Sequence, residues 1–189
     1  MADSLHVIAL ISGGKDSFYS ILHCIQNGHK VVALGNLYPP APPTKSHPES
    51  LTKNEEAEKE GEQDLNSFMY QTVGHTVIPL YEQALGIPLY RQQITGSAVQ
   101  TGTSYSHSAV PAAGTLACEA ESRDGNTDET ESLIPLLKRI IAEHPDANAL
   151  STGAILSTYQ RTRVESVALR LGLTPLSYLW QYPDRKSVV

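Results

Sequence analysis

The first forty residues alternate between two short aliphatic runs and one amphipathic segment. Residues 5–11 are almost continuously aliphatic, which predicts a strand buried on both faces. From Lys15 onward, apolar residues recur at helical spacing until Asn27 and Gly28, and residues 31–34 then form a second aliphatic run. A strand, a glycine turn, a helix and a strand make a βαβ unit, so this segment predicts a parallel sheet.

The same alternation returns in the rest of the chain. The later predicted elements are, in order, a helical apolar face between 65 and 85, a strand at 88–94, a helix at 129–144, a strand at 147–150, a helix from 157 to Gly172 and a last short strand within 173–180. We therefore expect an α/β fold, with a doubly wound, Rossmann-like parallel sheet of about five strands and helices on both faces.

Two polar stretches interrupt this pattern. Residues 39–62 begin with Pro-Pro-Ala-Pro-Pro and contain few apolar residues, which is typical of a solvated loop. Residues 95–128 are rich in Ser, Thr, Gly and Ala and keep neither a helical nor a strand period, so we interpret them as a largely disordered insertion. We expect one domain over 1–182 that contains both loops, followed by a short tail at 183–189.

Composition excludes several classes of protein. The 189 residues carry 14 Lys and Arg against 20 Asp and Glu, a net charge of −6, which argues against direct binding of nucleic acid through clustered cations. No apolar run approaches the roughly 20 residues that cross a bilayer. Two cysteines, Cys24 and Cys118, are too few for a disulfide scaffold or a four-ligand zinc site. These features favour a soluble protein of a reducing compartment, the cytoplasm.

Candidate chemistry is concentrated where the first predicted strand meets the first helix, in the string Ser12-Gly13-Gly14-Lys15-Asp16-Ser17. The glycines let the backbone approach a ligand, and the N-terminus of the helix favours an anion. The serines add hydroxyl donors, the lysine adds a cation, and the aspartate can hold Mg²⁺ or orient the loop. The spacing differs from that of the Walker loop. The alternative is a tight turn with no ligand.

This string resembles the PP-loop, Ser-Gly-Gly-x-Asp-Ser, of ATP pyrophosphatases of the adenine-nucleotide α-hydrolase type. The resemblance implies that the loop binds the β- and γ-phosphates of ATP, which is cleaved to AMP and pyrophosphate while a substrate is adenylated. It implies ATP and Mg²⁺ as cofactors, Lys15 and Asp16 as catalytic residues, and Asp16 as the magnesium ligand. The expected nucleotide-binding residues are Ser12, Gly13, Gly14, Lys15, Asp16, Ser17, Gly74, His75 and Gly153. His75 has two alternatives, which are to cap the turn after Gly74 or merely to pack.

Two further strings narrow the family. Residues 67–75 (SFMYQTVGH) and 153–165 (GAILSTYQRTRVE) resemble the diphthine–ammonia ligases, and the ending at 175–180 (PLSYLW) fits the same family. The resemblance covers nearly all of the chain outside the two polar stretches. We expect the N-terminal part of a fungal-type member, in which further domains follow. The resemblance implies ATP-dependent amidation of diphthine on translation elongation factor 2, with ammonium as the nitrogen source and an acyl-adenylate as intermediate.

The residues that the resemblance places at the substrate are Tyr70, Gln71, Tyr159, Gln160, Arg161, Arg163 and Glu165, with Arg161 and Arg163 as further catalytic residues. Planar guanidinium groups suit a carboxylate or a phosphate. On a helix from Ser157, however, Arg161 and Glu165 lie at i,i+4, so the alternative is a surface ion pair. Gly153 follows a predicted strand, which places this string at the carboxyl edge of the sheet, beside the 12–17 loop.

Two other functions remain open at this stage. One is a non-catalytic module that binds an adenine nucleotide through a related fold. The other is a PP-loop enzyme that modifies transfer RNA, which the acidic charge and the lack of a Cys-x-x-Cys pair make the weaker alternative.

Overall fold

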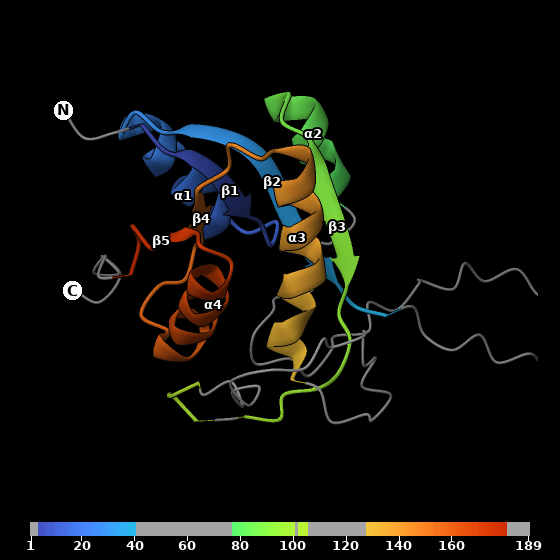
Figure 1. The fold of residues 1–189 in the computed structure, drawn as a ribbon. Coiled ribbons are helices and arrows are strands. Elements are labelled where there is room, and N and C mark those ends of the chain that lie inside the picture. Colours follow the sequence, from blue (N-terminus) through green and yellow to red (C-terminus); the bar gives the residue numbers. More distant parts are fainter. Residues whose placement is uncertain (1–3, 41–76, 101, 106–127, 181–189) are drawn as a thin grey trace, which may run out of the picture.

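The computed structural model of the chain describes residues 4–40, 77–100, 102–105 and 128–180 (Figure 1). In chain order the elements are β1 (His6–Leu10), α1 (Lys15–Gln26), β2 (Lys30–Tyr38), α2 (Ile78–Leu85), β3 (Leu89–Gln93), the 3₁₀ turn η1 (Glu129–Ser132), α3 (Leu133–Glu143), β4 (Ala149–Ser151), α4 (Thr158–Arg170) and β5 (Thr174–Leu176). The strands form one sheet in the order β3-β2-β1-β4-β5, and every neighbouring pair is parallel. The predicted fold class is confirmed.

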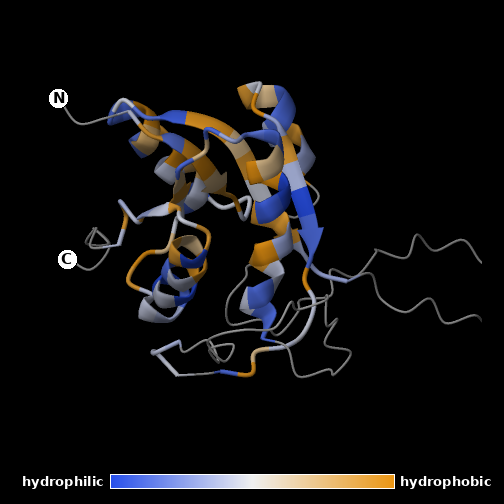
Figure 2. Ribbon diagram, in the orientation of Figure 1, coloured by the Kyte–Doolittle hydropathy of each residue, from blue (hydrophilic) through white to orange (hydrophobic). Residues whose placement is uncertain are grey.

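Helices cover both faces of the sheet because successive residues of a buried strand point to opposite sides. On β1, Ile8 packs with residues of α3 and α4, whereas Val7 and Ala9 pack with Ile21 of α1 and Ile78 of α2. Figure 1 shows α3 and α4 on the near side of the sheet, and Figure 2 shows hydrophobic residues gathered between the layers. The sheet is therefore buried on both faces, as its aliphatic runs predict.

The strand order reverses direction at the centre of the sheet. From β1 the chain moves outward through α1 to β2 and through α2 to β3. It then returns past β1 to β4 and β5, and the helices of this half, α3 and α4, lie on the other face. The carboxyl ends of β1 and β4 diverge at this switch point, where open α/β sheets bind their ligands.

The helix predicted at 129–144 is divided in two. Residues 129–132 form η1, and the α-helix α3 begins only at Leu133. Pro135 explains the division, because in a continuous α-helix its ring would collide with the carbonyl group of Glu131, four residues earlier. In the first turn of α3 the missing N–H of proline has no cost, since that group has no helical partner there.

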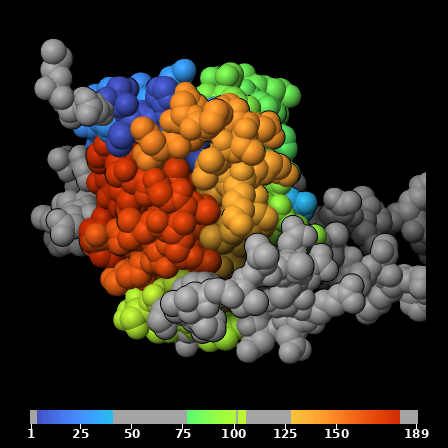
Figure 3. All heavy atoms as spheres, viewed as in Figure 1, coloured from blue at the N-terminus to red at the C-terminus, as the bar shows by residue number. Residues whose placement is uncertain are grey.

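Of the polar stretch at 95–128, the structure describes residues 95–100, 102–105 and 128, and specific hydrogen bonds hold these residues. Residues 97–100 and 102–105, which we call the strap, lie below α4 in the view of Figure 3, and the carbonyl oxygen of Ser97 accepts from the N–H of Glu129 in η1. Ser97 pairs with Asp128 in a β-bridge, and the backbone N–H of Thr95 donates to Ser132 Oγ over 2.9 Å. Polar groups rather than apolar ones anchor the strap, so no hydrophobic period marks it in the sequence.

Several predictions concern residues outside the described ranges, namely Tyr70, Gln71, Gly74, His75, Cys118, most of the two polar stretches and the tail at 183–189. Within the described ranges, no helix has both the length and the apolar character that a membrane-spanning segment requires.

Candidate active site

A cavity of about 360 Å³ opens at the switch point, between the carboxyl ends of β1 and β4. Its walls come from the 12–17 loop, the end of β2, the start of α3, and the loop and helix that follow β4. The predicted site residues that line it are Ser12, Gly14, Asp16, Ser17, Gly153 and Gln160. The fold thus brings together two strings that lie about 140 residues apart in the sequence.

The 12–17 loop is shaped by its own hydrogen bonds. Gly13 has a φ of +82°, a left-handed conformation that glycine adopts without steric cost. The hydroxyl group of Ser17 donates to the carbonyl oxygen of Gly14 over 2.8 Å and accepts from the N–H of Ser12 over 3.3 Å. Gly14 is the N-cap of α1 and, having no side chain, leaves the first turn of the helix uncovered toward the cavity.

The loop after β4 packs directly on this first turn. A Cβ atom on Gly153 would lie 2.8 Å from the backbone N and Cα of Ser17, closer than real Cβ atoms approach backbone. Further along α1, the Ser20 hydroxyl lies 2.8 Å from the hydroxyl of Ser151, the last residue of β4, and both residues are buried. Only glycine at 153 allows the two loops to form one continuous wall.

Lys15 and Asp16 provide the charges of the loop. Lys15 Nζ lies 2.7 Å from Asp16 Oδ1, and the two side chains are 84% and 43% exposed. Exposed ion pairs contribute little to stability, so these charges are not needed for folding. No cluster of three His, Cys, Asp or Glu side chains that could hold a metal ion occurs among the described residues. Asp16 offers one carboxylate at the cavity, which suits Mg²⁺ that is shared with phosphate oxygens.

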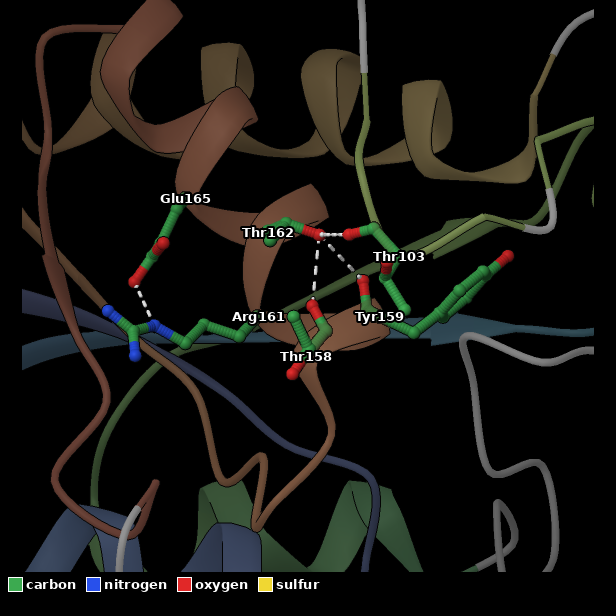
Figure 4. A network of polar contacts seen from close by, with 6 residues as sticks. All are labelled: Thr103, Thr158, Tyr159, Arg161, Thr162 and Glu165. Carbon is green, nitrogen blue, oxygen red and sulfur yellow. Dashed lines mark hydrogen bonds and ion pairs between the residues drawn. The ribbon is translucent and has the colours of Figure 1, made fainter.

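Arg161 lies outside the lining of the cavity. Its Nε is 2.5 Å from Glu165 Oε1, four residues along α4, and its guanidinium group lies 4.9 Å from the centroid of the Trp180 ring. Figure 4 shows the Arg161 side chain turned toward Glu165. The i,i+4 ion pair that the spacing allows is therefore present, with Arg161 37% exposed.

Arg163, two residues later, is fully buried and also lies outside the cavity lining. Its guanidinium group stacks on the ring of Tyr159, 3.4 Å from the centroid, and donates to the carbonyl oxygens of Gln100 and Gly102. Beside it, the Thr162 hydroxyl lies 3.0 Å from the carbonyl oxygen of Thr103 (Figure 4). Arg163 and its neighbour thus fasten the strap to α4.

Acidic residues fasten the strap from the η1 side. Asp128 accepts hydrogen bonds from the backbone N–H groups of Gln100 and Thr130 over 3.1 and 3.0 Å. Burial of Asp128 acts to raise its pKa, but these hydrogen bonds and the nearby charge of Arg163 outweigh it and hold the pKa below the usual value. Glu131 accepts from both terminal nitrogens of Arg170, 2.8 and 2.9 Å away, and from the Tyr105 hydroxyl.

Sequence reasoning missed three residues that shape the site. Asn36 is buried at the end of β2 and donates to the carbonyl oxygen of Ile11, directly before the 12–17 loop. The Tyr81 hydroxyl reaches the carbonyl oxygen of Gly13 over 3.3 Å. Asp128 caps η1. Asp128, as a capping residue ahead of an apolar run, and Asn36, as a polar residue in an apolar strand, were detectable signals.

The two arginines of the 153–165 string allow a direct test of these environments. We expect Arg163→Met to lower the free energy of unfolding by about 2–5 kcal/mol, because it removes buried hydrogen bonds to two strap carbonyl groups. Arg161→Met should cost less than about 1 kcal/mol, as for a half-exposed i,i+4 pair. Urea unfolding of both variants measures the difference. Equal losses would contradict the assignment of Arg163 to the interior.

The strap should also respond to acid through Asp128. A carboxyl group whose folded pKa lies below its unfolded value stabilises the protein above that unfolded value, about 3.9, and loses this contribution as the pH falls through the folded pKa. We expect the stability difference between wild type and Asp128→Asn to stay constant from pH 6 to about pH 5 and to shrink as the pH falls further toward pH 2. Chemical denaturation at several pH values measures it, and a pH-independent difference would contradict the assignment.

Comparison with known proteins agrees with the two strings. No family model matches the chain. It is 43% identical over 182 residues to the diphthine–ammonia ligase of Schizosaccharomyces pombe, covering 96% of this chain and 24% of that protein. It is 44% identical over 178 residues to the Bos taurus ligase and 43% identical over 178 residues to the Homo sapiens ligase, covering 94% of this chain and 54% of each relative.

The chain therefore spans about a quarter of the length of the Schizosaccharomyces pombe relative and about half of the length of the two mammalian relatives. A cavity at the switch point, walled by the two strings that the sequence singles out, accompanies this similarity. Over nearly all of its own length, the chain is a homologue of the diphthine–ammonia ligases.

Proposed function

We propose that this chain carries the ATP site of a diphthine–ammonia ligase. The reaction is the ATP-dependent amidation of diphthine on translation elongation factor 2, which gives diphthamide, AMP and pyrophosphate. The observation that carries the proposal is the contact between the 12–17 loop and Gly153, which builds one cavity from two motifs of this family. The 43–44% identity to three ligases supports the same conclusion. The proposal also includes elongation factor 2 as the protein substrate, ammonium as the nitrogen source, and a cytoplasmic location.

In this proposal the terminal phosphates of ATP bind at the N-terminus of α1. The first-turn N–H groups and the helix dipole attract an anion, and Gly14 puts no side chain in its way. Lys15 lies beside this turn and adds a positive charge. Mg²⁺, when bound, would neutralise charge on the departing pyrophosphate, and Asp16 is the residue of the loop that would hold it.

The rest of the cavity can hold the remainder of the nucleotide and the reacting group. Its far wall is mostly apolar, with Leu37 of β2, Leu133 of α3 and Val164 of α4, and such a surface suits the flat faces of a base. Gln160 is the polar residue of the Tyr159–Glu165 string that lines the cavity, beside Val164. We propose Gln160 as a contact for the acceptor side of the reaction, with Arg161 at the outer edge.

The proposed reaction needs no covalent nucleophile from the chain. The diphthine carboxylate attacks the α-phosphorus, the bond to the β-phosphate bridging oxygen breaks, and pyrophosphate leaves. Ammonia, formed from ammonium by loss of a proton, then attacks the acyl carbon of the acyl-adenylate and displaces AMP. The residues of the 12–17 loop act by stabilising the negative charge on the departing pyrophosphate. Cys24 is buried in the α1 core, where burial raises the pKa of its thiol.

Binding of Mg-ATP tests the first half of the proposal. Lys15→Ala and Asp16→Ala should each weaken binding by roughly 10-fold or more, because each removes a charge that faces phosphate or Mg²⁺, while leaving the unfolding curve unchanged. The matched control is Lys30→Ala, an exposed lysine at the opposite end of the sheet. Calorimetric titration measures all three. Wild-type affinity in a folded Lys15→Ala variant would refute the loop assignment.

Formation of AMP tests the second half and needs a longer protein that contains this domain, since the curated relatives extend well beyond it. With elongation factor bearing diphthine, and with ammonium and Mg-ATP, we expect Arg161→Ala to lower the rate at least 30-fold if the arginine meets the anionic acceptor. An arginine that only pairs with Glu165 predicts less than a fivefold change. Binding of Mg-ATP without any AMP in the wild type would favour the non-catalytic module.

A further inference from the structure

We propose that Arg91, on β3 and outside the cavity, is a positioning residue for the 12–17 loop. It acts through an oriented chain of hydrogen bonds that runs from the middle of β3 across the carboxyl ends of β2 and β1. The inference rests on the proposed function where it concerns ATP, but the chain of hydrogen bonds is a property of the protein without ligand.

The chain of hydrogen bonds starts at two residues that are partners in the register of β2 and β3. Arg91 of β3 lies directly opposite Asn36 of β2, and Arg91 Nε donates to Asn36 Oδ1 over 3.0 Å. Asn36 Nδ2 then donates over 2.9 Å to the carbonyl oxygen of Ile11, which follows β1. Arg91 is itself held in place, because its guanidinium group lies over the Tyr38 ring, 4.9 Å from the centroid.

The chemistry of the two partners fixes the orientation of the Asn36 amide. An arginine nitrogen can only donate, so it must face the amide oxygen, and a carbonyl oxygen can only accept, so it must face the amide NH₂. Asn36 is 3% exposed, so turning the amide around would bury two donors against each other and two acceptors against each other. Arg91 and the Ile11 carbonyl oxygen together hold the Asn36 amide so that it presents an N–H to Ile11.

The chain continues into the loop through one peptide group. The carbonyl oxygen of Ile11 accepts from Asn36, and the N–H of the same peptide unit, on Ser12, points to Ser17 Oγ at 3.3 Å. Ser17 in turn donates to the carbonyl oxygen of Gly14 over 2.8 Å. Every donor points the same way, from the guanidinium group toward the N-cap of α1, and hydrogen bonds aligned in this way polarise one another.

The consequence concerns the plane of the Ile11–Ser12 peptide, which is where β1 turns into the loop. This peptide is held by Asn36 on its carbonyl side and by Ser17 on its N–H side. If Arg91 is removed, Asn36 loses one of the two partners that hold its amide, and the peptide becomes less restricted. The first residues of the loop would then have to be ordered by the ligand, at a cost in affinity.

The test uses the 189-residue chain and three variants. Arg91→Met keeps the stem over Tyr38 but removes the donor, Asn36→Ala removes the middle of the chain, and the third variant combines both. Arg139→Met is the matched control, since it also removes a guanidinium group that lies over a tyrosine ring, and the hydrogen bond that it removes goes to the backbone carbonyl oxygen of Arg91 and not to its side chain. Nuclear magnetic resonance of the Ser12 amide without ligand and calorimetry with Mg-ATP are the two readouts.

We expect Arg91→Met to shift the Ser12 amide resonance and speed its hydrogen exchange, and to weaken Mg-ATP binding by about 5–10-fold. Arg139→Met should leave Ser12 unchanged and affinity within twofold. The double variant should bind no more weakly than Asn36→Ala alone, because Arg91 acts only through Asn36. Additive losses, or equal effects of Arg91→Met and Arg139→Met, would overturn the proposal.

Two outcomes separate this inference from the proposed function. A wild-type chain that binds no Mg-ATP but shows the Ser12 response to Arg91→Met would refute the nucleotide site and keep the hydrogen-bond chain. Normal nucleotide binding with an unchanged Ser12 amide would do the opposite. If Arg91→Met does not fold, Arg91→Leu replaces it, since leucine also has no donor for Asn36 Oδ1, and an unchanged Ser12 amide there would also overturn the proposal.

Discussion

The site depends on the close approach of two backbones at the switch point of the sheet. The loop after β4 lies against the first turn of α1 so tightly that a single added carbon at Gly153 would meet backbone atoms of Asp16 and Ser17. This contact exists because β1 and β4 are neighbours whose helices leave toward opposite faces. One loop supplies the helix N-terminus and its charges, and the other supplies the wall that carries Gln160.

Hydrogen bonds from polar side chains hold the segments on either side of this contact, beyond the apolar core. On one side, Arg163 and Asp128 hold the strap against α4 and η1. The helix α4 contributes Val164 to the cavity lining, and η1 leads directly into α3, which contributes Leu133. On the other side, Arg91 and Asn36 tie the ends of β3 and β2 to the 12–17 loop. In both places an arginine is stacked on a tyrosine ring, which limits its freedom and directs its donors. The loops at this edge of the sheet are thus fixed by hydrogen bonds rather than by burial of apolar surface.

The two arginines of one short string illustrate why similar residues have different roles. Arg161 and Arg163 stand two positions apart on α4, so they leave the helix about 160° away from each other on an ideal helical wheel. Arg161 meets Glu165 and Trp180 near the surface, whereas Arg163 points into the interior and meets Tyr159 and the strap. The sequence predicts that this string contacts the substrate, with an Arg161–Glu165 surface pair as the alternative. In the structure Gln160 and Val164 line the cavity, Arg161 pairs with Glu165, and Arg163 lies in the interior.

The sequence by itself determined the five-strand parallel sheet and the position of the 12–17 loop. Aliphatic runs, helical periods and a glycine turn are local patterns, and each reports the burial of its own segment. Gln160 and Val164 were also placed correctly on one helix face, because i,i+4 spacing is local. Only the tertiary structure decided that Arg163 is internal, that residues 97–100 and 102–105 pack against η1 and α4, and that Arg91 reaches the loop through Asn36. These relationships join polar groups from distant segments, and a hydrogen bond between distant residues leaves no periodic trace in the chain that makes it.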